Sequence, residues 1–164
     1  MNSAPYKSQR AQEMRQEFDR SFTLPHISTR TLAEQLLAIS IGALPFAIRL
    51  SEISGLHADK NITRVPGTDK AMIGIAGFRG AIAPIYDLAS LMGEERNKAP
   101  RWLIVAARAP IGFAFDGFDG QLRVPPDAIK HQTSGHAFVR ELVQTENMLR
   151  PIIGLQPLVE SIKA

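Results

Sequence analysis

The stretch from Gly74 to Leu88 reads GIAGFRGAIAPIYDL, and it decides how the rest of the chain is interpreted. Gly77 and Gly80 flank Phe78-Arg79. Glycines at this spacing predict a tight turn, because glycine adopts positive φ without strain. An arginine between two apolar strands cannot lie in the core without a partner. The turn is therefore expected to present Arg79 to solvent or to another protein.

The residues that follow the turn predict a strand and then a short helix. Residues 81–86 are apolar enough for a buried strand, and Pro84 within them indicates a sheet edge or a bulge. Asp87 is placed to cap a helix that buries the apolar residues of 88–92, and Gly93 is placed to end it.

Beyond this stretch, short apolar segments alternate with turn residues from Leu36 onward. Several short strands at near-regular spacing favour an all-β barrel or sandwich over βαβ units. Only short helices fit between them, at 87–92, 126–130 and 157–162. Two Asp-Gly dipeptides within 116–120 predict a hairpin turn. The candidate strands are 36–41, 45–50, 61–65, 81–85, 102–107, 111–115, 118–124, 138–143 and 148–153.

Residues 1–30 differ from the rest in being polar and rich in basic side chains, so they are predicted to form an N-terminal helical extension to a domain spanning 31–164. Met14, Phe18 and Phe22 are four residues apart and share one face of a predicted helix over 9–22. That helix either docks on its own domain through the apolar stripe or binds a partner, and a disordered arm is the third alternative.

Composition bounds the class of protein. The chain has 164 residues, 45% of them hydrophobic, which suits one domain or two small lobes that share a core. It has no cysteine, which fits a reducing compartment, and neither a signal peptide nor an apolar run of membrane-spanning length. The net charge of +3 is small and spread along the chain, which is weak evidence that the protein binds nucleic acid. We expect a cytoplasmic protein.

The sequence offers no catalytic constellation. The four histidines lack the spacing of a zinc site, and the aspartates of 116–120 lack the pattern of a calcium loop. There is no phosphate-binding glycine motif and no nucleophile elbow, and the carboxylates are scattered. These observations predict a protein that is not an enzyme and that needs no metal or cofactor.

The pattern Gly74-x4-Arg79-Gly80-x3-Pro84-x2-Asp87-Leu88 resembles the signature of CheW, the bacterial chemotaxis coupling protein. The resemblance covers roughly residues 35–164. Weaker similarity extends to 46–50 with Ile53, 61–65, 112–118, 148–155 and 157–162.

The resemblance implies a mainly β fold of two SH3-like five-stranded β-barrel lobes that share a core, with short helices. One lobe would centre on about 52–110, and the remaining segments would form the other, so the lobes are interleaved along the chain. The implied function is a non-catalytic adaptor that couples the cytoplasmic tips of methyl-accepting chemoreceptors to the regulatory domain of a CheA-type histidine kinase. Such an adaptor would be recruited to membrane-associated receptor arrays.

The resemblance also implies site residues. Arg79, with Phe78 and Gly80 beside it, would bind the receptor, and Ile53 and Gly74 would serve the kinase contact. From the residues alone, a structural Arg79 that donates to turn carbonyls is the other interpretation. A small nucleic-acid-binding β-barrel is the alternative function.

Three departures from the family pattern suggest a specialised paralogue, such as one serving a surface-motility pathway. Gly77-Phe78 replaces asparagine-leucine, and Gly55 stands where many relatives carry a glutamate. The third departure is an N-terminal extension longer than a minimal member needs.

Overall fold

The structure is a computed structural model that describes residues 32–67, 69–133 and 135–164. The predicted helix over 9–22 lies outside the described residues, so its docking stays a prediction. The compact unit formed by the described part spans Ala33–Ala164.

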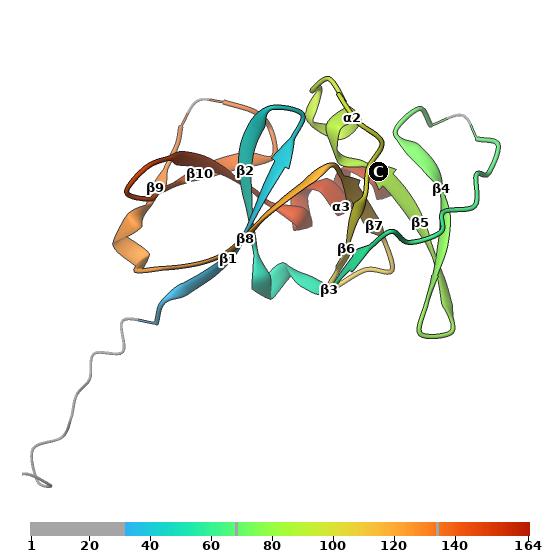
Figure 1. Ribbon diagram of the computed structural model, residues 1–164, viewed down its shortest axis with the longest axis horizontal. Coiled ribbons are helices and arrows are strands. Elements are labelled where there is room, and N and C mark those ends of the chain that lie inside the picture. The colour runs from blue at the N-terminus through green and yellow to red at the C-terminus, as the bar shows by residue number, and fades with distance from the viewer. Residues whose placement is uncertain (1–31, 68, 134) are drawn as a thin grey trace, which may run out of the picture. The chain divides into compact units, whose positions relative to one another are not determined.

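Two β-sheets make up this unit (Figure 1). The first is six-stranded and contains one parallel pair, between β2 and β11. Its spatial order is β8 (Gly117–Val124), β1 (Glu34–Ile41), β2 (Leu44–Arg49), β11 (Leu149–Ile153), β10 (Val139–Gln144) and β9 (Ile129–His131).

The second sheet is five-stranded, and it also has one parallel pair, between β5 and β7. Its strands come from one continuous part of the chain, whereas the first sheet takes strands from before and after it. The predicted interleaving of two SH3-like lobes is therefore confirmed. The spatial order is β3 (Ile53–Ala58), β6 (Trp102–Ala106), β7 (Gly112–Phe115), β5 (Ala81–Asp87) and β4 (Met72–Phe78).

Alternation of side chains along the strands creates three separate cores. Leu36 faces the interior of the first lobe, and the next residue, Leu37, faces the core that both lobes share. In the second lobe Leu103 faces the lobe interior and Ile104 faces the shared core. Successive residues of a strand point to opposite faces of the sheet. Strands buried on both faces therefore read as continuous apolar runs, which is the pattern of the sequence.

Short helices complete the unit. Helix α2 (Leu88–Met92) follows Asp87 and ends at Gly93, which adopts the left-handed conformation predicted for it. Helix α3 (Leu155–Lys163) begins just before the predicted helix 157–162 and buries Leu155, Leu158 and Val159 in the shared core. Two short 3-10 turns, η1 (Leu50–Glu52) and η2 (Pro126–Ala128), precede β3 and β9.

Four sequence-based assignments are wrong. Segment 61–65 is not a strand but contributes one isolated bridge, between Thr63 and Ile75. The strands β3 and β4 were not expected. The helix predicted at 126–130 is the turn η2 followed by β9, so the first lobe has six strands rather than five.

The fourth error concerns residues 116–120, which do not form a hairpin. Strand β7 ends at Phe115 and β8 begins at Gly117 in the other sheet, so Asp116 is the crossover between the lobes and 117–120 are the first residues of β8. Its aspartates serve other elements of the first lobe: Asp116 accepts a hydrogen bond from the Gly42 backbone, and Asp119 accepts bonds from Ser40 and Arg150.

Candidate functional site

A two-residue turn presents Arg79 at the tip of the β4–β5 hairpin. Phe78 pairs with Ala81, which leaves Arg79 and Gly80 as the loop, with φ values of +48° and +82°. Two positive φ values in a two-residue loop are the pattern of a type I′ turn, in which Asn-Gly or Gly-Gly is the usual sequence. Arg79 is exposed, as expected. It adopts a left-handed conformation that arginine normally avoids, and such strain is concentrated at functional sites.

Gly77 does not belong to this turn, contrary to the prediction from sequence. It lies within β4 opposite Ile82, and its φ is not positive. A Cβ at this position would meet only the Ala81 carbonyl oxygen, at 4.0 Å. The hairpin closes with Arg79-Gly80 alone, because that loop needs only two residues of positive φ.

Gly74 lies where two backbone segments approach each other closely, which leaves no room for a side chain. Its φ is +153°, and the β4–β5 register shifts beside it. A Cβ on Gly74 would overlap the carbonyl oxygen of Thr63 and come within 2.9 Å of Ile62 Cγ2. Thr63 exchanges two backbone hydrogen bonds with Ile75, so this segment lies directly against β4.

Phe78 is part of a small cluster of aromatic and basic groups next to the turn. The ring centroids of His57 and Phe78 are 4.9 Å apart, and Lys60 Nζ lies 5.0 Å from the Phe78 ring centroid. Burial lowers the pKa of His57, and the positive charges of Lys60 and Arg79 lower it further. His57 and Lys60 could not be found from the sequence, because β3 and β4 are the two edge strands of the second sheet and meet only when that sheet curls round on itself.

The His57 ring also accounts for the glycine at position 55. A Cβ on Gly55 would lie 2.9 Å from His57 Nε2, so the imidazole occupies the space over this glycine. At this position the surface therefore presents an imidazole close to the positive charges of Lys60 and Arg79.

An apolar groove of about 390 Å³ runs beside the hairpin, bounded by Phe78 on one side and the end of β6 on the other. Ile82 lies between two groove residues on β5 and is 69% exposed, so its side chain points to the opposite face of the strand from the groove. Ile53 is half-buried and packs against the shared core, whereas the next residue, Ser54, lines the groove. The lining residues are Ser54, Phe78, Ala81, Ala83 and 105–110.

The five predicted site residues thus fall into two groups. Phe78, Arg79 and Gly80 lie together at the hairpin tip. Ile53, at the start of β3, and Gly74, inside β4, are held by packing within the second lobe. In residues 32–164, apart from the two undescribed positions, no group of three or more His, Asp or Glu side chains is placed to hold a metal ion. In that same part of the chain, no helix is both long and apolar enough to cross a membrane.

Comparison with known proteins gives this fold its context. The family model of the CheW-like domain matches residues 35–163. The chemotaxis protein CheW of Bacillus subtilis (strain 168) is 22% identical over 138 residues, covering 77% of this chain and 87% of that protein. The CheW of Thermotoga maritima is 25% identical over 144 residues, covering 81% and 95%.

A solved structure has the same fold. The scaffolding protein TtCheW of Thermoanaerobacter tengcongensis superposes with a TM-score of 0.68 at 21% identity, covering 74% of this chain and 89% of that one. The family match over most of the chain, on this two-lobed fold, indicates a scaffold or adaptor of the chemotaxis type. The chain belongs to the CheW-like family, and the findings do not favour a nucleic-acid-binding barrel.

Proposed function

We propose that this protein is a non-catalytic cytoplasmic adaptor that couples chemoreceptor tips to a CheA-type histidine kinase. One observation carries the proposal: within a CheW-like domain, an exposed arginine is held in a left-handed conformation at the tip of a hairpin. Arginine suits such a contact, because its planar guanidinium makes several hydrogen bonds at once and its stem packs on apolar surface.

The receptor contact is assigned to Phe78, Arg79 and Gly80 together with the adjoining apolar groove. The groove supplies the apolar part of an interface, and Arg79 supplies hydrogen-bond donors that orient the partner. Lys60 and Arg79 make this surface positive. The receptor segment that meets it is expected to carry a carboxylate, because complementary charge gives specificity and a faster encounter.

The kinase contact is assigned to the part of the second lobe that contains Ile53 and Gly74. Ile53 is only half-buried, so part of its side chain remains for a partner. Gly74 supports this surface by allowing the segment around Thr63 to pack against β4. Its role is therefore to position backbone rather than to touch the partner with a side chain.

Binding measurements on three variants test the proposal. Arg79→Ala is expected to weaken binding to a receptor cytoplasmic tip by about 1–3 kcal/mol, as for truncation of a central interface arginine. Ile53→Asp is expected to weaken binding to the kinase regulatory domain in titration calorimetry, because a charge is desolvated at an apolar contact. Arg140→Ala, an exposed arginine on β10, is the matched control and should bind both partners normally.

The two assignments fail separately. Normal receptor affinity in a folded Arg79→Ala variant would show that the arginine is structural. Normal kinase affinity in a folded Ile53→Asp variant would move the kinase interface elsewhere on the domain. Because Ile53 also packs against the shared core, the fraction of folded protein must be measured for this variant before its affinity is interpreted.

A further inference from the structure

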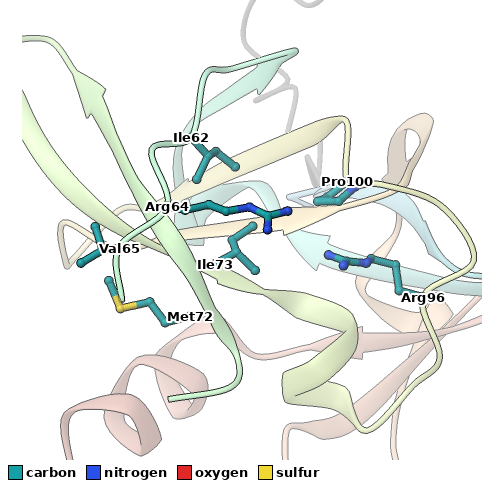
Figure 2. A pocket seen from close by; sticks show the side chains of 7 residues that line it. All are labelled: Ile62, Arg64, Val65, Met72, Ile73, Arg96 and Pro100. Atoms are coloured by element: carbon teal, nitrogen blue, oxygen red, sulfur yellow. The ribbon is translucent and has the colours of Figure 1, made fainter. Parts of the chain in front are cut away.

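A second pocket, of about 510 Å³, lies at the opposite end of β4 from the arginine hairpin. Figure 2 shows the guanidinium groups of Arg64 and Arg96 pointing toward one another across it. Arg64 comes from the segment that packs against β4, and Arg96 comes from the loop after α2. The remaining lining is formed by Ile62, Val65, Met72, Ile73 and Pro100.

The two guanidinium groups are poorly neutralised within the protein. Among the described residues, Arg64 forms no ion pair, and Arg96 forms one, in which Arg96 Nη1 lies 3.7 Å from Asp87 Oδ2. That distance is too long for a strong charge-assisted hydrogen bond, which spans about 2.7–2.9 Å. Asp87 Oδ2 instead accepts a hydrogen bond of 2.7 Å from the Ser90 hydroxyl. Both arginines therefore retain capacity to donate to a ligand.

Asp87 holds Arg96 at the pocket but leaves hydrogen-bond donors of its guanidinium unpaired. Asp87 is only 4% exposed, and its Oδ1 atom has no hydrogen-bond partner among the described residues. A buried carboxylate with an unpaired oxygen attracts a nearby cation. It therefore holds Arg96 near the pocket, while the long separation leaves the outer donors of the guanidinium free. On the opposite side of the pocket, Arg64 has no ion pair among the described residues to hold it in place.

The lining between the two arginines is apolar, and this selects the class of ligand. Four aliphatic or thioether side chains and a proline leave little to hydrogen-bond with a fully hydrated anion. Ligand pockets are commonly about 300–1,000 Å³ and combine an apolar lining with a few converging polar groups. The matching ligand has a carboxylate for the guanidinium groups and an apolar group directly beside it.

We propose that this pocket binds an acidic peptide segment of a partner protein, in which an Asp or Glu lies next to an aliphatic or aromatic residue. The carboxylate accepts hydrogen bonds from Arg64 and Arg96, and planar guanidinium groups match carboxylates in the bidentate geometry. The neighbouring apolar side chain fills the space over Ile73 and Met72. The pocket uses none of the residues assigned to the receptor contact, but it shares with the proposed kinase contact the segment around Thr63, which Ile62 and Arg64 flank.

Peptide selection on the full-length protein tests the proposal. Random linear peptides displayed on phage are selected on the parent protein and, in parallel, on the Arg64→Ala/Arg96→Ala double variant. The selected peptides are expected to share an Asp or Glu beside Leu, Ile, Met or Phe, and to be absent from the selection on the double variant. In fluorescence anisotropy, a labelled representative should lose affinity by about tenfold or more in the double variant.

Three controls separate the outcomes. Arg140→Ala removes an exposed arginine outside the pocket and should leave peptide affinity unchanged. Arg64→Gln keeps the Arg96–Asp87 pair, and should still lower affinity if the double variant proves unstable. Inorganic phosphate at millimolar concentration should not displace the peptide.

Several results would overturn the proposal. One is the absence of any peptide that prefers the parent protein over the double variant. Another is a set of selected peptides that lack an acidic residue. Displacement by inorganic phosphate as effective as that by unlabelled peptide would make this a site for phosphate groups instead.

Discussion

Replacing Arg79 with asparagine should make the protein more stable and less able to bind. A non-glycine residue in the left-handed conformation costs roughly 1–2 kcal/mol, and asparagine tolerates that conformation better than arginine does. Arg79→Asn also places Asn-Gly in a loop whose two φ values, +48° and +82°, suit that dipeptide. The charge of Arg79 also opposes protonation of His57, so its removal relieves repulsion only at pH values where the imidazole is charged.

The expected gain is about 1 kcal/mol in the free energy of unfolding, since Arg79 is exposed and screening by water reduces the electrostatic part. For a chain of this size, that gain raises the melting temperature by about 2–4 °C. Binding to a receptor tip should fall by about 1–3 kcal/mol, because the guanidinium is lost. Stability and affinity therefore change in opposite directions, which a purely structural arginine would not produce.

Urea denaturation and thermal melting measure the first change, and titration calorimetry with a receptor tip measures the second. Arg79→Lys is the matched control, because it keeps the charge and most of the left-handed strain but loses the planar fork. Unchanged or lower stability in Arg79→Asn would refute the strain argument. Unchanged affinity would refute the assignment of Arg79 to the interface.

Three further predictions follow from the packing of particular residues. Gly74→Ala should lower the unfolding free energy by about 2 kcal/mol or more, because its Cβ would overlap the Thr63 carbonyl at a positive φ. Gly77→Ala should lower it by less than about 1 kcal/mol, and denaturant titration of both variants compares the two costs. Arg150→Met should cost about 2–4 kcal/mol by the same measurement, because it leaves two backbone carbonyls and a carboxylate without their donor. Because the folded state lowers the pKa of His57, stability should fall as pH drops below 6.5 toward the folded-state pKa, and His57→Gln should flatten this part of the profile in pH-dependent melting.

The interleaving of the lobes and the exposed arginine turn could be predicted from the sequence. The short apolar segments indicated an all-β fold, and the resemblance carried by the Arg79-Gly80 signature implied the interleaved lobes. The strand β4 could not be predicted by the same reasoning. It contains Gly74 and Gly77, which weaken strand propensity, and it forms because β5 pairs with it along most of its length.

The composition of the site surface was the least predictable part. The contact between His57 and Phe78 joins the two edge strands β3 and β4, so it depends on the second sheet curling into a barrel, and no local pattern signals it. Gly77 was assigned to the turn because a glycine in a sequence does not reveal its φ. In the structure, Gly80 is the glycine of the turn, and Gly77 is an ordinary strand residue.

Gly74 influences both the surface around Phe78 and the pocket between Arg64 and Arg96. The strand β4 is at the edge of its sheet, and the segment around Thr63 covers part of that edge through its two hydrogen bonds with Ile75. The close approach is possible only because Gly74 has no side chain. The same segment places Lys60 near the Phe78 ring and Arg64 in the pocket that it lines together with Arg96. A side chain at Gly74 would therefore displace both cations, and disturb both surfaces without lying in either.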